Sequence, residues 1–306
     1  DIFFLMRKNL LHINLVLVLV FCSGFCFSNK IDDLKTDGDV ERFVHKIDRD
    51  YKEFRVVGLD ELYSSPKSKQ VTDSLGAKAW QKADFDGNGL TDLFVNGMYA
   101  GQNHLLVFVA KDQRFLLYSL RIALFGDVTF TSISNTKYGK CDLLVVVQPY
   151  YTFTVDEPAR MRHDTLIYKF GNFIELNRKP EKHKIKRVEF STSGCFGICP
   201  VFEMAFNADR AATYNAINYN EQSGLYYGKI DTLSLATFTH LLNYIDFVHL
   251  KDSYEVSWTD DQSCTLKIIY DDDKVKTIYD YGLIGTRGLK LIYDKFFVMR
   301  NTQKWR

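Results

Sequence analysis

The sequence of 306 residues lacks an excess of charge of either sign. Lysine and arginine together number 39, aspartate and glutamate number 38, and the formal net charge is +1. Binding to nucleic acid or to anionic lipid relies on a strong positive field. The balance therefore argues against a nucleic acid partner. Hydrophobic residues make up 46% of the chain, which is long enough for two domains with separate cores.

Known catalytic motifs are also missing. The chain has no HExxH, GxSxG or phosphate-loop pattern and no glycine pattern of a dinucleotide-binding fold. The glycines of GLIGTRG, residues 282–288, have the wrong spacing for phosphate binding and stand where a helix cap is expected. These absences favour a binding or structural protein over an enzyme, and no catalytic residue is assigned. The partner is left open as a protein or a glycan.

The N-terminal segment has the features of an export signal. Arg7 and Lys8 precede the apolar run NLVLVLVFCSGFCF, residues 14–27. This run is shorter than the roughly 20 apolar residues of a membrane-spanning helix. We therefore expect residues 1–28 to be a cleaved signal peptide, with an uncleaved anchor or lipidation at Cys22 as alternatives. The mature chain is expected to be periplasmic, secreted or at the cell surface, and to touch a membrane only through this segment.

Aromatic residues make up 15% of the chain, and they favour strands over helix interiors. A helix is predicted from Asp37 onward, and the patterns after it are mostly those of strands. The polar stretch at 63–74 is expected to be a surface loop. We therefore predict a β-rich domain at residues 37–176.

Two segments of this β-rich domain resemble each other. GLTDLFVNG at 89–97 aligns with GKCDLLVVV at 139–147, and the predicted hairpin at 104–120 resembles that at 164–176. The second copy lacks the acidic ligands of the first, so only the first is expected to bind an ion. Two such units are too few to close a propeller of about 4 to 8 blades, so we predict a sandwich or an open sheet.

The C-terminal part, residues 184–304, is predicted to be an α+β domain. A polar and basic linker at 177–187 leads into it. Strand patterns alternate with two helical stretches at 235–250 and 287–301, which predicts an antiparallel sheet with two helices. The acidic run 271–273 is interpreted as a solvated hairpin turn. The fold class of the whole chain is therefore α+β and strand-rich.

The sharpest chemical signal is the loop DFDGNGLTD at 84–92. A calcium ion takes about 6 to 8 oxygen ligands, and alternating loop positions supply oxygens here. The predicted ligands are the side chains of Asp84, Asp86, Asn88 and Asp92 and the backbone carbonyl of Leu90. Val95 stands where an EF-hand has its bidentate glutamate, so a dissociation constant of about 10⁻⁴ to 10⁻³ M is expected. The alternative is an Asx turn, in which the carboxylates accept hydrogen bonds from local amides.

Export places the cysteines that follow the signal peptide in a compartment where disulfides form. Cys195 and Cys199 flank FGI in a tight loop that suits the bridging Cα separation of about 4.4 to 6.8 Å. A structural disulfide is predicted. Redox chemistry and a metal site completed by His183 or Cys264 are the alternatives. Cys141 and Cys264 are interpreted as small residues within strands.

The stretch SGCFGICPVFEM, residues 193–204, carries a CxGxCPxY/F signature with Phe202 at its last position. Together with motifs such as VKTIYDYGLIGTRG, it makes residues 184–304 resemble a bacterial secreted family of domains of unknown function. KADFDGNGLTDLFVNG, further upstream, resembles the calcium loops of FG-GAP-like repeats. The resemblance implies the fold and export, but it implies no activity.

Overall fold

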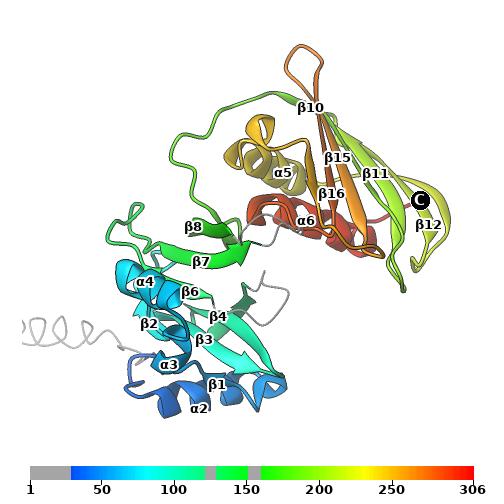
Figure 1. Cartoon of the computed structure of the whole chain (residues 1–306). Coiled ribbons are helices and arrows are strands. Elements are labelled where there is room, and N and C mark those ends of the chain that lie inside the picture. Colours follow the sequence, from blue (N-terminus) through cyan, green and yellow to red (C-terminus); the bar gives the residue numbers. More distant parts are fainter. Residues whose placement is uncertain (1–28, 121–128, 151–159) are drawn as a thin grey trace, which may run out of the picture.

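The structure is a computed structural model that describes residues 29–120, 129–150 and 160–306 (Figure 1). It contains three sheets, mostly antiparallel, and a few helices, so the predicted strand-rich α+β class is confirmed. The predicted signal peptide, residues 1–28, lies outside the described residues. Within the described ranges, no helix combines the length and the apolar character needed to cross a membrane.

The first sheet is a meander that carries helix α2 on its outer face. Its strands are β1 (Arg55–Val56), β2 (Trp80–Ala83), β3 (Asp92–Tyr99), β4 (Gln102–Lys111) and β5 (Arg114–Ser119). The strands β2 to β5 pair in chain order, and β1 also pairs with β3. Helix α2 (Asp37–Ile47) begins after the capping residue Thr36 and packs Phe43 and Val44 against this sheet. The helix predicted from Asp37 onward is confirmed, and a 3-10 turn, η1 (Arg49–Tyr51), follows it.

The second sheet repeats the layout of the first. Its strands β6 (Phe130–Ile133), β7 (Leu144–Tyr150), β8 (Arg160–Lys169) and β9 (Asn172–Glu175) also pair in chain order. The aligned segments at 89–97 and 139–147 fall on β3 and β7. Apolar residues from both sheets, among them Phe94 and Leu144, share one buried cluster. The two units therefore pack face to face as a sandwich, which is one of the two arrangements that the sequence predicted.

The polar stretch expected to be a surface loop is mostly helical. Helix α4 (Pro66–Leu75) follows a short helix, α3 (Leu59–Leu62). The Ser65 side chain accepts a hydrogen bond from the Ser68 amide, Pro66 takes the first helical position, and Gly76 ends the helix at a φ of 61°. The loop prediction was wrong because α4 buries only Thr72 and so lacks the apolar periodicity by which helices are recognised.

The third sheet forms the C-terminal half of the molecule. Its order is β13-β12-β11-β10-β15-β16-β14, and all pairs are antiparallel except β14 with β16. The strands are β10 (Ile185–Thr192), β11 (Val201–Asn207), β12 (Ala211–Asn218), β13 (Gly224–Lys229), β14 (Ser253–Glu255), β15 (Ser263–Tyr270) and β16 (Lys274–Tyr281). The acidic run 271–273 joins β15 to β16, as predicted for a hairpin turn.

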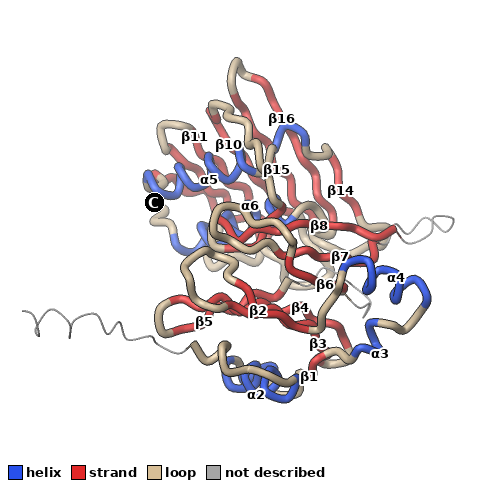
Figure 2. Tube along the Cα trace, turned by 90° about the vertical axis from the view of Figure 1, so that its left-hand side faces the viewer, coloured by secondary structure: helices blue, strands red, loops and turns tan. Residues whose placement is uncertain are grey.

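Two helices cover one face of this sheet (Figures 1 and 2). They are α5 (Thr232–Tyr244), which a 3-10 turn η2 (Phe247–His249) follows, and α6 (Arg287–Thr302). Thr286 caps α6 through a hydrogen bond from the Leu289 amide, as the sequence predicted. A Cβ added at Gly288 would lie 2.4 Å from Cγ2 of Ile245, so glycine is needed where α6 approaches the end of α5.

Helix α6 lies between the second and third sheets (Figure 1). Ile167 and Ile174 of the second sheet, and Leu143 just before β7, belong to the same buried cluster as residues of the helices α5 and α6. The order of layers is therefore α2, first sheet, second sheet, the helix pair, and third sheet. This stacking brings the loops between β2 and β3 and between β6 and β7 together on one side of the sandwich.

Candidate functional site

The acidic loop connects β2 to β3, and two glycines shape it. Gly87 and Gly89 have φ values of 72° and 84°, which non-glycine residues rarely adopt. One carboxylate oxygen from each of Asp84, Asp86 and Asp92 lies within 4.8 Å of the other two. The structure therefore brings together the three predicted acidic ligands in a group that can hold a metal ion.

Local amides also hold these carboxylates. Oδ1 of Asp84 accepts the Gly87 and Asn88 amides at 2.8 and 3.1 Å, and its Oδ2 accepts the Gly89 amide at 2.9 Å. These are the bonds of the alternative Asx-turn interpretation. They do not exclude a cation, because Oδ2 accepts one of these three amides and has a second lone pair. The amides instead fix the orientation of the carboxylate.

Asp92 is the most buried member of the group. Its two oxygens accept the Phe85 amide at 2.8 Å and the Ala110 amide at 2.7 Å, and the side chain is fully buried. Burial raises the pKa of Asp92 to about 7, and the carboxylates of Asp86 and Asp84 add to the shift. Burial also raises the pKa of Asp86, with Asp84 as a further cause. Crowded, buried carboxylates of this kind need either protons or a cation.

The other two predicted ligands lie in the same loop but outside the acidic group. The Asn88 side chain donates to Asp86 Oδ2 at 3.1 Å and to the Ala110 carbonyl at 2.7 Å. Its Oδ1 accepts the Leu90 amide at 2.7 Å. The assignment of the Asn88 oxygen and the Leu90 carbonyl as ligands therefore remains a prediction.

The second unit contributes a residue that the sequence did not single out. Asp142 is aligned with Asp92, and its Oδ2 accepts the Asp84 amide at 2.8 Å. The Asp142 amide donates in return to the Asp84 carbonyl at 2.8 Å, and Lys137 pairs with the Asp142 carboxylate at 2.8 Å. Cys141 lies close by, since a Cβ at Gly87 would be 3.2 Å from its sulfur. The acidic loop is thus fixed at the seam between the two units, and the repeat alignment itself was the signal for Asp142.

The second predicted site is the loop between β10 and β11. Cys195 and Cys199 form a close pair with Cα atoms 5.7 Å apart, a separation that suits a disulfide. At the base of the loop, the side-chain amide of Gln262 donates hydrogen bonds to the carbonyls of Ser193 and Pro200 at 3.0 and 2.9 Å. This side chain ties both limbs of the loop to the start of β15.

The tip of this loop is strongly apolar and open to solvent. Phe196 is 90% exposed and Ile198 is 83% exposed. Large apolar side chains that are open to solvent in this way are available for contact with another molecule. Among the described residues, no group of metal ligands includes either cysteine of the loop. Cys141 and Cys264 are free thiols, and burial raises the pKa of both.

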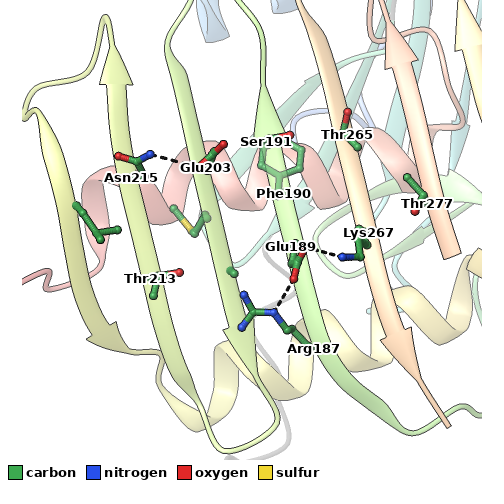
Figure 3. Close-up of a pocket in the computed structure, with 13 residues that line it drawn as sticks. Arg187, Glu189, Phe190, Ser191, Glu203, Thr213, Asn215, Thr265, Lys267 and Thr277 are labelled. Carbon is green, nitrogen blue, oxygen red and sulfur yellow. Dashed lines mark hydrogen bonds and ion pairs between the residues drawn. The ribbon is translucent and has the colours of Figure 1, made fainter. Parts of the chain in front are cut away.

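The outer face of the third sheet, opposite the helices, forms a shallow groove of about 560 Å³ (Figure 3). Glu189 lies in its centre and pairs with Arg187 at 2.7 Å and with Lys267 at 3.2 Å. Hydrogen bonds from Arg187 and then Lys267 lower the pKa of Glu189. The rest of the groove is lined by small polar side chains, among them Thr213 and Thr265, and by apolar ones such as Leu225. Such a surface is suited to hydrogen bonding with a partner, because its central carboxylate is held in the charged form.

Comparisons with known proteins identify one region of the chain. A search of curated proteins and of solved structures gives no match. A family comparison does match the C-terminal half, and the matched segment falls inside the stretch 184–304 that the sequence assigned to a domain with the CxGxCPxY/F signature. Residues 186–299 form a domain of the family described as Domain of unknown function (DUF6438).

Proposed function

We propose that this chain is an exported, non-enzymatic binding or structural protein whose N-terminal sandwich is stabilised by calcium. The observation that carries this proposal is the group of Asp84, Asp86 and Asp92 at the seam between two similar β units. A cation there neutralises carboxylates that repel one another. The hydrogen bond from the Asp84 amide to Asp142 joins this loop of the first unit to the second unit.

The donor set is that of a hard cation. Carboxylate, amide and carbonyl oxygens are the ligands that calcium prefers, and the loop holds no nitrogen or sulfur ligand within its acidic group. Asn88 and Leu90 complete the proposed set, with water in the remaining positions. Calcium occupies this site as a structural ion and supplies no chemistry to a substrate.

Calcium is expected to raise the melting temperature of the protein. At a free concentration of ten to a hundred times the dissociation constant, binding adds about 1.4 to 2.7 kcal/mol to the free energy of unfolding. Differential scanning calorimetry with millimolar calcium and with chelator measures the shift. Asp86→Asn removes one charged ligand without adding repulsion, so it is expected to fold and to lose most of the calcium response.

Asp112→Asn is the matched control, because Asp112 is an exposed carboxylate in the turn between β4 and β5 of the same sheet and lies outside the acidic group. It is expected to keep the full calcium response. A melting temperature that does not move with calcium would contradict the proposal. So would an equal shift in Asp86→Asn and wild type.

The C-terminal domain supports the binding part of the proposal. The pair Cys195 and Cys199, as a disulfide, holds Phe196 and Ile198 in a closed loop, which lowers the entropy lost when a partner covers them. The groove on the outer face of the third sheet, which has both polar and apolar side chains, offers a second contact surface. We propose a protein or glycan partner outside the cell, and no nucleic acid.

A thiol–disulfide enzyme using Cys195 and Cys199 is the second candidate, favoured by the position of the pair in an exposed loop. Alkylation followed by mass spectrometry distinguishes the two functions. A structural bridge is expected to resist alkylation and to be reduced slowly by a mild reductant, whereas a redox pair exchanges rapidly. Replacing both cysteines by serine is expected to cost about 2 kcal/mol of stability, since the closed loop is short.

A further inference from the structure

The segment that joins β9 to β10, residues 176–184, is attached to the end of α5. The Asn177 side chain donates to the Tyr244 carbonyl at 2.8 Å, and the Asn177 amide donates to the Tyr244 hydroxyl at 3.0 Å. Further along, the His183 amide donates to Oδ1 of Asn243 at 3.0 Å. These bonds place the side chains of the segment beside the turn η2 that follows α5.

Three potential metal ligands meet there, and a fourth, His183, lies next to one of them. Glu181, Asp246 and His249 each place one ligand atom within 4.8 Å of the other two. His183 joins them through Glu181, because its Nε2 lies 3.6 Å from Oε2 of Glu181. Glu181 and His249 are exposed, so an ion reaches the cluster from solvent.

The orientation of the His183 ring favours a positively charged ion between its Nε2 atom and the Glu181 carboxylate. Its Nδ1 lies 2.8 Å from Oδ2 of Asp271, and because a carboxylate only accepts, Nδ1 carries the hydrogen. Nε2 then presents a lone pair toward the Glu181 carboxylate, and it is buried with no hydrogen-bond partner among the described residues. Two acceptors that face each other need either a proton on Nε2 or a metal ion between them.

The surroundings of His183 match those of a metal-binding histidine. A carboxylate that holds the second ring nitrogen is the usual outer partner of such a residue. Here Asp271 is itself fixed by the Lys184 amide at 2.8 Å. The rings of Phe247 and Tyr270 contact the imidazole edge-on, with centroids 5.5 and 5.2 Å away. The ring is therefore held in place before any ion binds.

The charge around His249 also favours a cation. Its Nδ1 lies 2.8 Å from Oδ1 of Asp246, which leaves Nε2 available. Lys276 is the positively charged residue whose electrostatic effect reaches His249 in the described part of the chain. Its ammonium group donates hydrogen bonds to the Leu250 carbonyl at 2.5 Å and to Asp252 at 2.6 Å. The cluster thus combines two carboxylates with two imidazoles.

We propose that Glu181, His183, Asp246 and His249 bind a zinc ion, which fastens the segment between the two halves of the chain to the end of α5. Two imidazoles with two carboxylates suit zinc, whereas calcium and magnesium take oxygen ligands. This site is separate from the acidic loop between β2 and β3 and uses none of its residues.

Isothermal titration of the metal-free full chain with zinc chloride tests the proposal. Wild type is expected to bind one zinc ion at this site, and His249→Ala to weaken that binding about a hundredfold or more. His240→Ala is the matched control, because His240 is an exposed histidine on α5 outside the cluster, and its affinity is expected to equal that of wild type. Asp271→Asn, which changes only the outer partner of His183, is expected to weaken binding about tenfold to a hundredfold. Wild type that binds no zinc, or His249→Ala that binds as tightly as His240→Ala, would overturn it.

Trypsin cleavage tests whether zinc holds the segment 176–184 against the end of α5, independently of whether zinc binds. The segment carries Arg178, Lys182 and Lys184 as cleavage sites. Zinc is expected to slow cleavage of wild type in this segment and to leave the cleavage rate of His249→Ala unchanged. Equal rates for wild type with and without zinc would show that the ion does not fasten the segment.

Discussion

Replacing Glu175 by alanine is expected to lower the free energy of unfolding by about 3 kcal/mol. Glu175 ends β9, and its carboxylate accepts the first amides of α6, from Arg287 at 2.7 Å and Gly288 at 3.0 Å. It also pairs with Arg162 at 2.9 Å, and Arg162 pairs in turn with Asp164 at 2.7 Å. Alanine leaves two helix amides and a largely buried guanidinium without this acceptor.

The same carboxylate is a connection between the two halves of the molecule. A negative charge at the N-terminus of a helix is stabilised by the helix dipole, and here the charge comes from the other half of the chain. Burial lowers the pKa of Arg287 to about 10, and Asp164 and Glu175 act against that shift. Loss of Glu175 therefore weakens both the start of α6 and the contact of α6 with the second sheet.

Urea denaturation measures this effect. Glu175→Gln keeps an oxygen acceptor but loses the charge, so its loss of stability is expected to fall between those of wild type and Glu175→Ala. Glu203→Ala is the control, because Glu203 is exposed on the outer face of the third sheet and bonds only Asn215 in the described structure. A loss for Glu175→Ala no larger than that for Glu203→Ala would contradict the role assigned to Glu175.

The contribution of Asp280 to the free energy of unfolding is expected to fall as the pH rises from about 4 to about 6. This carboxyl group, 1% exposed at the end of β16, accepts the Ile284 and Gly285 amides at 2.9 and 3.0 Å. Burial raises the pKa of Asp280 from 3.8 to about 6. The folded state therefore binds the proton more tightly than the unfolded state does. The stabilisation is complete below pH 4 and is lost as the pH approaches 6, by about 3 kcal/mol in all.

Asp280→Asn isolates this contribution, because asparagine does not ionise. The comparison uses the slope of the unfolding free energy against pH between 4 and 6, so any constant loss of stability in the variant cancels. Asp272→Asn, in the exposed turn between β15 and β16, is expected to keep the wild-type slope. Equal slopes for wild type and Asp280→Asn would contradict the prediction.

The surroundings of Asp280 also explain the glycines of GLIGTRG. A Cβ at Gly285 would lie 2.6 Å from Oδ2 of Asp280, and Gly282 has a φ of 83°. These glycines serve the turn before α6 and the approach of that helix. The sequence placed the motif at a helix cap correctly, because the cap residue Thr286 and the apolar spacing of α6 are local signals.

The sequence alone determined the strand-rich α+β class, the two similar β units and the main helices α2, α5 and α6. It also determined the acidic group of Asp84, Asp86 and Asp92 and the close pair of Cys195 and Cys199. Each of these features is predicted from residues that are close in the sequence. The local signals are the alternation of apolar residues in strands, their helical spacing, the cap residues of helices, and ligands that lie close together in one loop. The same dependence explains the missed helix α4, whose caps were present but whose apolar stripe was not.

Only the tertiary structure decided which distant residues meet. It placed Asp142 against Asp84, Glu175 at the start of α6, and Glu181 beside Asp246 and His249. None of these pairs has a local pattern, because contacts between elements are set by how their apolar faces pack and not by spacing along the chain. The choice of a sandwich over an open sheet has the same cause, since it depends on both units burying their apolar faces against each other.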